Sequence, residues 1–226
     1  MNISETVMNI YIIRCRLLLT ALLLTCCPVA EAQKAGDVIT VTPRDEARYF
    51  YSAEIPDEVF QRMQGKSFPK TCTVKRSDLR YLRVLHYNRN GETQVGEMVC
   101  NKAISADLID IFRRLYDARY PIERMVLIDE YGADDERSME ANNTSCFNFR
   151  LMTGSTTRVS KHGLGMAVDL NPLYNPYVKG KTVKPKGAKL PPEITRSSLP
   201  YRLFTKHGFK WGGAWKSLKD YQHFEK

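Results

Sequence analysis

Two short clusters near the C-terminal end of the sequence contain residue types that bind zinc. The first spans residues 160–169 and the second residues 220–223. Together they offer two histidines and one carboxylate as ligands, with a second carboxylate three residues before the last histidine. Three protein ligands leave a fourth tetrahedral position for water, which is the arrangement of a catalytic rather than a structural zinc. The clusters therefore predict metal-assisted hydrolysis of an amide.

The histidines and carboxylates have distinct predicted roles. His162, Asp169 and His223 are the predicted zinc ligands, and Asp220 is the predicted general base. Zinc lowers the pKa of a bound water toward neutrality, and a carboxylate beside that water can take its proton as it attacks a carbonyl. Asp220 and His223 are three residues apart, so one helical turn would place them on one face. Isolated histidines and aspartates are more often core, turn or capping residues, and spacing alone leaves that interpretation open.

The local sequence indicates how the chain would position the first cluster. Gly163 and Gly165 can provide the reversal that brings His162 and Asp169 together, because glycine adopts backbone angles closed to other residues. Residues 166–168 are expected to begin a buried strand that ends near Asp169.

Other elements are predicted from hydrophobic periodicity and turn residues. A β-hairpin is expected from residues 79–86 and 92–100 across an Asn-Gly turn, and a further strand over 124–128. Predicted helices span residues 56–63 and 105–118. Residues 179–192 are rich in Lys, Pro and Gly and are expected to form a loop without regular structure.

A wider pattern of residues around the two clusters resembles a known family. The pattern is Ser160-x-His162-x-x-Gly165-x-Ala167-x-Asp169, followed by Asp220-x-x-His223-Phe224-Glu225. It is similar to the signature of zinc D-Ala-D-Ala carboxypeptidases, whose relatives include VanY-like carboxypeptidases, L-Ala–D-Glu endolysins and the hedgehog signalling domain. The resemblance covers roughly the last half of the chain, and it extends more weakly back to about residue 70.

The resemblance implies the same three zinc ligands and the same general base. It also implies an upstream arginine that binds substrate and stabilises the oxyanion, because a guanidinium can donate two hydrogen bonds to a carboxylate or developing oxyanion. Arg150 is the first candidate, and Arg137 and Arg158 are alternatives.

Three further residues are predicted to contact the substrate. Ser160 is expected to orient a ligand or touch the substrate, although a serine that only forms the turn fits the sequence equally well. Trp215 and Tyr221 are expected to line the substrate groove together with Trp211. The alternative is that both tryptophans pack beneath the metal site.

The fold expected from the resemblance is α+β, a single domain in which a small antiparallel sheet carries the zinc site and helices flank it. The domain is predicted to span residues 56–226, with a VanY-like core over about 120–226. Residues 33–55 are expected to form a loose lead-in, and residues 1–32 a signal peptide.

The N-terminal sequence predicts export to the periplasm or the extracellular envelope. Arg14 and Arg16 precede an apolar run over residues 17–24, and Ala30-Glu31-Ala32 precedes a cleavage site before Gln33. The apolar run is too short to span a membrane, so no transmembrane span is expected after cleavage. The alternative is a lipoprotein anchored through Cys27.

The net charge of the chain indicates which binding partners it has. The formal net charge is +9 over 226 residues, which suits the anionic polymers of a bacterial envelope. Nucleic acid is excluded as a partner because export is predicted and no aromatic-plus-basic motif is present. A monomer is expected.

Because export permits disulfides, Cys72 and Cys100 are predicted to pair, which leaves Cys146 as a buried free thiol.

The sequence therefore predicts a secreted zinc metallopeptidase that hydrolyses a peptide bond in bacterial peptidoglycan or its precursors. D-Ala-D-Ala carboxypeptidase and L-Ala–D-Glu endopeptidase activity both remain open. The alternative is a zinc-stabilised binding module of the cell envelope that has no catalytic activity.

Overall fold

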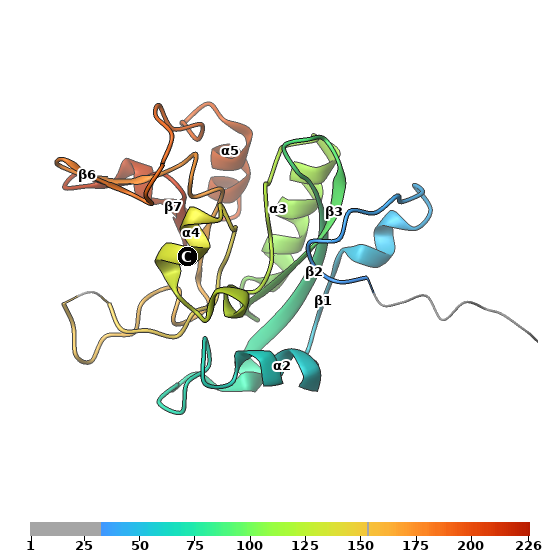
Figure 1. The fold of residues 1–226 in the computed structure, drawn as a ribbon, viewed down its shortest axis with the longest axis horizontal. Coiled ribbons are helices and arrows are strands. Elements are labelled where there is room, and N and C mark those ends of the chain that lie inside the picture. The colour runs from blue at the N-terminus through green and yellow to red at the C-terminus, as the bar shows by residue number, and fades with distance from the viewer. Residues whose placement is uncertain (1–32, 153) are drawn as a thin grey trace, which may run out of the picture. The chain divides into compact units, whose positions relative to one another are not determined.

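The computed structural model describes residues 33–152 and 154–226, of which Lys34–Lys226 form one compact unit. This unit is α+β, as predicted, with short helices around three small antiparallel sheets of three strands each (Figure 1). The predicted signal peptide and Cys27 lie outside the described residues. Within the part of the chain that is described, no helix has both the length and the apolar character to cross a membrane.

The first sheet has the strand order β1-β2-β3 and contains the predicted hairpin. Its strands are β1 (Tyr51–Ala53), β2 (Leu79–Tyr87) and β3 (Thr93–Asn101). Strands β2 and β3 pair from Leu79 opposite Asn101 to Tyr87 opposite Thr93. The Asn88 side chain closes the turn by accepting hydrogen bonds from the backbone amides of Asn90 and Glu92, at 2.9 Å each.

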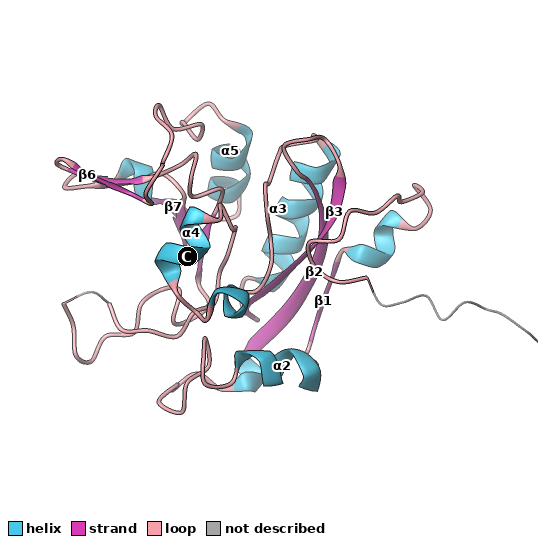
Figure 2. Cartoon of the chain, in the orientation of Figure 1, coloured by secondary structure: helices cyan, strands magenta, loops and turns pink. Residues whose placement is uncertain are grey.

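Both faces of this sheet are buried, and alternate residues face different clusters. Leu82 and Val84 join the largest core cluster, which also contains the apolar side of α3 (Ser105–Asp117). Leu79 and Tyr81 face a second cluster, which contains Val59 and Met63 of α2 (Asp57–Met63). Figure 2 shows α3 running beside β2 and β3. Both predicted helices are confirmed.

The predicted Cys72–Cys100 disulfide is wrong. Cys72, Cys100 and Cys146 are all free thiols in the described chain. Cys100 is buried in the cluster beneath α3, whereas Cys72 lies in a loop against the cluster on the other face of the sheet. Two cysteines on opposite faces of one sheet cannot be joined without moving the backbone. Cys146 is the predicted buried free thiol.

The second sheet has the order β4-β9-β7 and packs on the main core. Its strands are β4 (Ala167–Asp169), β9 (His223–Glu225) and β7 (Lys210–Trp211). Helix α5 (Leu199–Lys206) covers it, with the rings of Phe204 and Phe224 stacked at 4.2 Å between centroids. The expected buried strand ending at Asp169 is thus present.

The third sheet has the order β6-β5-β8, from β5 (Tyr177–Lys179), β6 (Thr182–Lys184) and β8 (Lys219–Asp220). The expectation that residues 179–192 lack regular structure is therefore wrong, because β6 lies within them and Gly180 supplies the left-handed turn residue, with φ 58°. One short helix, α4 (Asp135–Glu140), and four 3₁₀ helices complete the elements: Glu46–Tyr49, Arg76–Asp78, Ile128–Tyr131 and Gly212–Ala214.

Two segments differ from their predicted form. The strand expected over residues 124–128 is an extended segment with a single bridge from Arg124 to Asn143, after which the chain enters a 3₁₀ helix. The segment expected as a loose lead-in contributes β1 to the first sheet, and Ile39, Val41 and Tyr49 pack against a small apolar cluster.

His86 on β2 makes folding stability depend on pH. Its Nδ1 lies 2.8 Å from the carbonyl oxygen of Ile122, and its buried Nε2 has no partner in the structure. Burial lowers the pKa of His86 to about 4, although the hydrogen bond to Ile122 opposes this shift. In the unfolded chain a histidine has a pKa of about 6.5. Between these values only the unfolded state takes up the proton, so stability is lost as pH falls from about 6.5 to 4.

We expect this loss to reach about 3 kcal/mol, from 1.36 kcal/mol for each pKa unit. Urea denaturation of the wild type and of His86→Leu at pH 7 and pH 4.5 measures it. The variant should be less stable at pH 7 but should lose less stability on acidification. Equal losses in the two proteins would show that His86 is not responsible.

Candidate metal centre

His162, Asp169 and His223 meet at one point of the structure. Nε2 of His162 lies 3.2 Å from Oδ1 of Asp169 and 3.2 Å from Nδ1 of His223, and the latter lies 3.0 Å from the same Oδ1. These three residues form a group that could hold a metal ion. The sequence prediction had brought together the same three residues.

Strand pairing places two of the three residues. Asp169 ends β4 and stands opposite His223, the first residue of β9. Their side chains therefore lie on the same face of the sheet, as directly paired residues of antiparallel strands do. Asp169 is fixed further by two backbone hydrogen bonds with Ser145, of 3.0 and 3.1 Å.

A tight turn before β4 carries the third residue, His162. Gly165 has φ 68°, and a side chain there would approach the backbone nitrogen of Asn101 to 2.7 Å. Glycine is thus required at this position for conformation and for space. The imidazole is oriented by its Nδ1, which lies 2.7 Å from the carbonyl oxygen of Cys146.

The donor atoms suit a tetrahedral zinc ion. Zinc–nitrogen and zinc–oxygen bonds of about 2.0–2.1 Å in tetrahedral geometry place ligand atoms about 3.4 Å apart. The three separations of 3.0–3.2 Å approach that value. The two imidazoles and the carboxylate are almost fully buried, with side-chain exposures of 8%, 9% and 14%. Two imidazoles and one carboxylate are also a donor set that zinc accepts in catalytic sites.

Burial and ion pairing perturb the cluster strongly. Burial by itself lowers the pKa of His223, but hydrogen bonds with Asp169 and Glu225 outweigh it and raise the pKa to about 10. For Asp169 the directions are opposite. Burial by itself raises its pKa, but the charges and hydrogen bonds of His162 and His223 outweigh burial and lower the pKa well below its usual range. Such strongly shifted groups are frequent at functional sites.

Asp220 lies beside this cluster. Its spacing from His223 suggested that a helical turn would place it there, but the segment is not helical. Asp220 ends β8, where it pairs with Tyr177 of β5, and a bend of two residues connects it to His223 at the start of β9. Its Oδ1 is buried without a hydrogen-bond partner in the structure. Burial and the negative charge of Asp169 raise the pKa of Asp220 to about 6. A buried carboxylate oxygen without a partner, beside a cluster that could hold a metal ion, is suited to receive a proton from a water molecule.

Gly212 allows Asp220 and His223 to come close together. A Cβ atom at Gly212 would lie 2.6 Å from the carbonyl oxygen of Asp220 and 3.2 Å from Cβ of His223. Since the nearest atom belongs to the backbone, the Gly212→Ala substitution must displace β8.

We expect Gly212→Ala to destabilise the protein by about 1–3 kcal/mol, as overpacking does, and to weaken zinc binding. Urea denaturation and a zinc titration measure the two effects. Ala214→Ser is the control, because Ala214 is exposed in the same 3₁₀ turn. Wild-type stability and zinc affinity in Gly212→Ala would show that the close approach has no importance.

The arginine candidates lie in different places. Arg150 is half-buried, and its Nε donates to Oδ2 of Asp135 in α4 at 2.7 Å. Its backbone carbonyl accepts from the amide of Ser160, so it borders the turn that carries His162. Arg137 and Arg158 are exposed. Among the three, Arg150 alone has this backbone link to the turn in the described hydrogen bonds.

The predicted substrate-contact residues divide into two groups. The Trp215 ring lies 5.3 Å from the His223 ring, between centroids, and is half-buried at the site. Trp211 belongs to the core, with its Nε1 donating to the carbonyl of Tyr221, whose ring packs against it at 5.9 Å. Ser160 accepts a hydrogen bond from the amide of Gly163 through Oγ, at 2.9 Å, which is the geometry of the turn-forming alternative.

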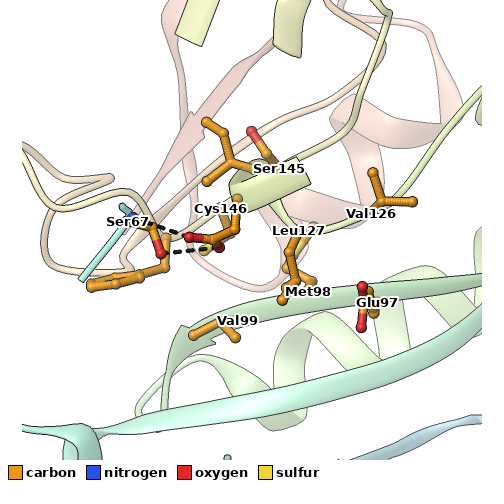
Figure 3. Close-up of a pocket in the computed structure, with 11 residues that line it drawn as sticks. Ser67, Glu97, Met98, Val99, Val126, Leu127, Ser145 and Cys146 are labelled. Atoms are coloured by element: carbon orange, nitrogen blue, oxygen red, sulfur yellow. Dashed lines mark hydrogen bonds between the residues drawn. The ribbon is translucent and has the colours of Figure 1, made fainter. Parts of the chain in front are cut away.

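A small pocket lies elsewhere in the fold, between β3 and the segment that contains Cys146 (Figure 3). Its lining includes none of the three clustered ligands and not Asp220. The buried carboxylate of Asp129 accepts two hydrogen bonds from Ser67, from the amide and from Oγ, each at 3.0 Å. Because this carboxylate already has partners and no predicted site residue lines the pocket, we assign it no catalytic role.

Sequence reasoning missed the surroundings of the ligands. It assigned no role to Glu225, although the residue belongs to the pattern quoted above, nor to Gly212 or to the carbonyl of Cys146. The position of Glu225 two residues after His223 was the available signal, since residues i and i+2 of a strand share a face.

Comparison with known families agrees with this geometry. The model of the family described as D-alanyl-D-alanine carboxypeptidase matches residues 153–226. That segment contains both clusters, whereas Arg150 precedes it. No solved structure matched the chain. The resemblance seen in the sequence is thus confirmed for this segment, because residues 153–226 are similar to the D-alanyl-D-alanine carboxypeptidase family.

Proposed function

We propose that this protein is a zinc-dependent peptidase that hydrolyses a peptide bond in bacterial peptidoglycan or its precursors. The observation that carries the proposal is the convergence of His162, Asp169 and His223 beside the unpaired carboxylate oxygen of Asp220. The family match over residues 153–226 supports the same class of reaction.

Each residue of the site has a separate proposed role in the reaction. Zinc, when held by the three ligands, supplies a Lewis acid that polarises a carbonyl oxygen and acidifies a water molecule. Asp220 accepts the proton of the attacking water and then transfers it to the amine that leaves. Its raised pKa, about 6, suits both steps near neutral pH. Trp215, beside His223, is proposed to contact the substrate.

Arg150 is proposed to bind an anionic group of the substrate. Its Nε donates to Asp135 and its Nη1 donates to the carbonyl oxygen of Asn148 at 3.4 Å. These contacts fix the guanidinium, and Nη2 is proposed to donate to the substrate. A fixed guanidinium can bind a terminal carboxylate or a developing oxyanion. The role of Ser160 is proposed to be structural, since its Oγ closes the turn around His162.

Removal of a terminal D-Ala from a D-Ala-D-Ala stem is the activity that the family description favours. Export to the bacterial envelope is proposed with it, because the substrate lies there, and the cationic surface would favour contact with anionic envelope polymers.

The bond specificity can be tested with two synthetic peptides, one ending in D-Ala-D-Ala and one containing an internal L-Ala–D-Glu bond. Release of free D-Ala from the first alone establishes a carboxypeptidase, and cleavage of the second alone an endopeptidase. A binding module would cleave neither. The buried Oδ1 of Asp220, which has no hydrogen-bond partner, argues against that alternative, since a purely structural zinc site has no use for it.

A further inference from the structure

Glu225 is a carboxylate that contacts the metal centre and has no part in the chemistry described above. Its Oε2 lies 3.2 Å from Nε2 of His223. The other nitrogen of that imidazole, Nδ1, faces Oδ1 of Asp169 and Nε2 of His162. One edge of the His223 ring therefore points into the ligand cluster, and the other points at Glu225.

Strand geometry holds this arrangement. His223 and Glu225 are the first and last residues of β9, so their side chains share one face. Phe224 between them points to the opposite face, where it is fully buried and stacked on Phe204. Burial of Phe224 thus fixes which face of β9 the other two residues occupy.

Both ring nitrogens of His223 face a carboxylate, Nδ1 facing Asp169 at 3.0 Å and Nε2 facing Glu225 at 3.2 Å. An ionised carboxylate can only accept hydrogen bonds, so each nitrogen can donate in the metal-free protein. A metal held by Asp169 would take the lone pair of Nδ1, and Glu225 would then keep the remaining proton on Nε2. His162 has the opposite arrangement, because its Nδ1 donates to the carbonyl of Cys146 at 2.7 Å and Nε2 keeps the lone pair. His162 Nε2 and His223 Nδ1 lie 3.2 Å apart, so with a metal bound both lone pairs would point at one ion.

We propose that Glu225 is a positioning residue that holds His223 in the orientation and tautomer in which Nδ1 binds the metal. This inference rests on the proposed function only in taking the cluster to be a zinc site. A carboxylate partner also makes the imidazole a stronger ligand than a neutral partner would.

The test compares zinc affinity in the wild type, Glu225→Gln and Glu225→Ala, by competition with a chromophoric chelator. Loss of such an outer partner typically weakens metal binding 10–100-fold, and we expect a loss in this range for Glu225→Ala. Glutamine keeps an acceptor oxygen but not the charge, so Glu225→Gln should fall between the other two. The visible absorption bands of the Co²⁺-loaded proteins should shift in the alanine variant and return toward wild type in the glutamine variant.

Glu193→Ala is the matched control. Glu193 is also a partly exposed carboxylate with an ion pair, at 2.6 Å from Arg89, away from the cluster. This variant should keep wild-type zinc affinity and cobalt spectrum. Thermal denaturation of the metal-free proteins identifies any variant that is simply unfolded, in which case Glu225→Gln decides the test.

Wild-type affinity and an unchanged cobalt spectrum in Glu225→Ala would overturn the inference without affecting the proposed function. A Glu225→Gln protein that is folded but binds zinc as weakly as Glu225→Ala would overturn the tautomer argument. A wild type that binds zinc but hydrolyses no peptide would overturn the function and leave the role of Glu225 standing.

Discussion

Asp220→Asn is expected to lower kcat by about 10²–10⁴-fold, the usual contribution of a general acid–base residue, while zinc remains bound. Asparagine has nearly the same shape as aspartate but cannot accept the proton of the attacking water. Since Asp220 is not among the three clustered ligands, the zinc content should equal that of the wild type. Steady-state kinetics and metal analysis of the same preparation measure both quantities.

The pH dependence gives a second readout of this prediction. Below its pKa Asp220 is protonated and cannot act as a base, so activity should fall as pH decreases. The pKa is about 6 in the metal-free structure, and the positive charge of zinc lowers it, so the acidic limb should lie at or below about pH 6. The residual activity of Asp220→Asn should lack that limb.

Asp78→Asn is the control for this substitution, because Asp78 pairs with Lys102 on the surface. It should retain full activity. An Asp220→Asn enzyme as active as the wild type would contradict the assigned role, and loss of zinc from that variant would assign Asp220 to the metal site instead.

His162→Ala is expected to abolish hydrolysis and to weaken zinc binding by more than about 100-fold, the upper value for losing an outer-shell partner alone. The substitution removes one of three ligands. It also leaves the almost fully buried Asp169 and His223 with one partner fewer.

Thermal denaturation with and without zinc checks this expectation independently of activity. Zinc at 100 times its Kd should stabilise the wild type by about 2.7 kcal/mol, and the same concentration should hardly stabilise His162→Ala. His207→Ala is the control, since His207 pairs with Asp107 and Asp110 on α3 and not with the cluster. An equal zinc response in His162→Ala and the wild type would contradict the ligand assignment.

The ligand cluster could be predicted because its residues occupy short motifs with characteristic neighbours. His162 and Asp169 lie within one turn and one strand, where glycine positions and apolar periodicity indicate the local structure. The hairpin and helices α2 and α3 were predictable for the same reason, since each is defined by a continuous pattern.

The sequence failed where partners distant in the chain decide the structure. The i,i+3 spacing of Asp220 and His223 suggested a helical turn, but pairing of Asp220 with Tyr177 of β5 makes that segment a strand. The same third sheet explains the hairpin found where a loop was expected. The sequence does not show that the first sheet separates Cys72 from Cys100, so a disulfide between them was expected. The ion pair of Arg150 with Asp135 likewise has no local sequence signal.

The central claim, metal-dependent peptide hydrolysis at this cluster, is tested most directly by titrating the metal-free protein with zinc. Each point is incubated with muropeptides of defined stem, and the products are identified by mass spectrometry. We predict that product formation rises with zinc and stops rising at one zinc per chain. We also predict that a single bond is cleaved, the one that releases terminal D-Ala. Stoichiometric zinc binding without cleavage of any bond would contradict the account and favour an envelope binding module.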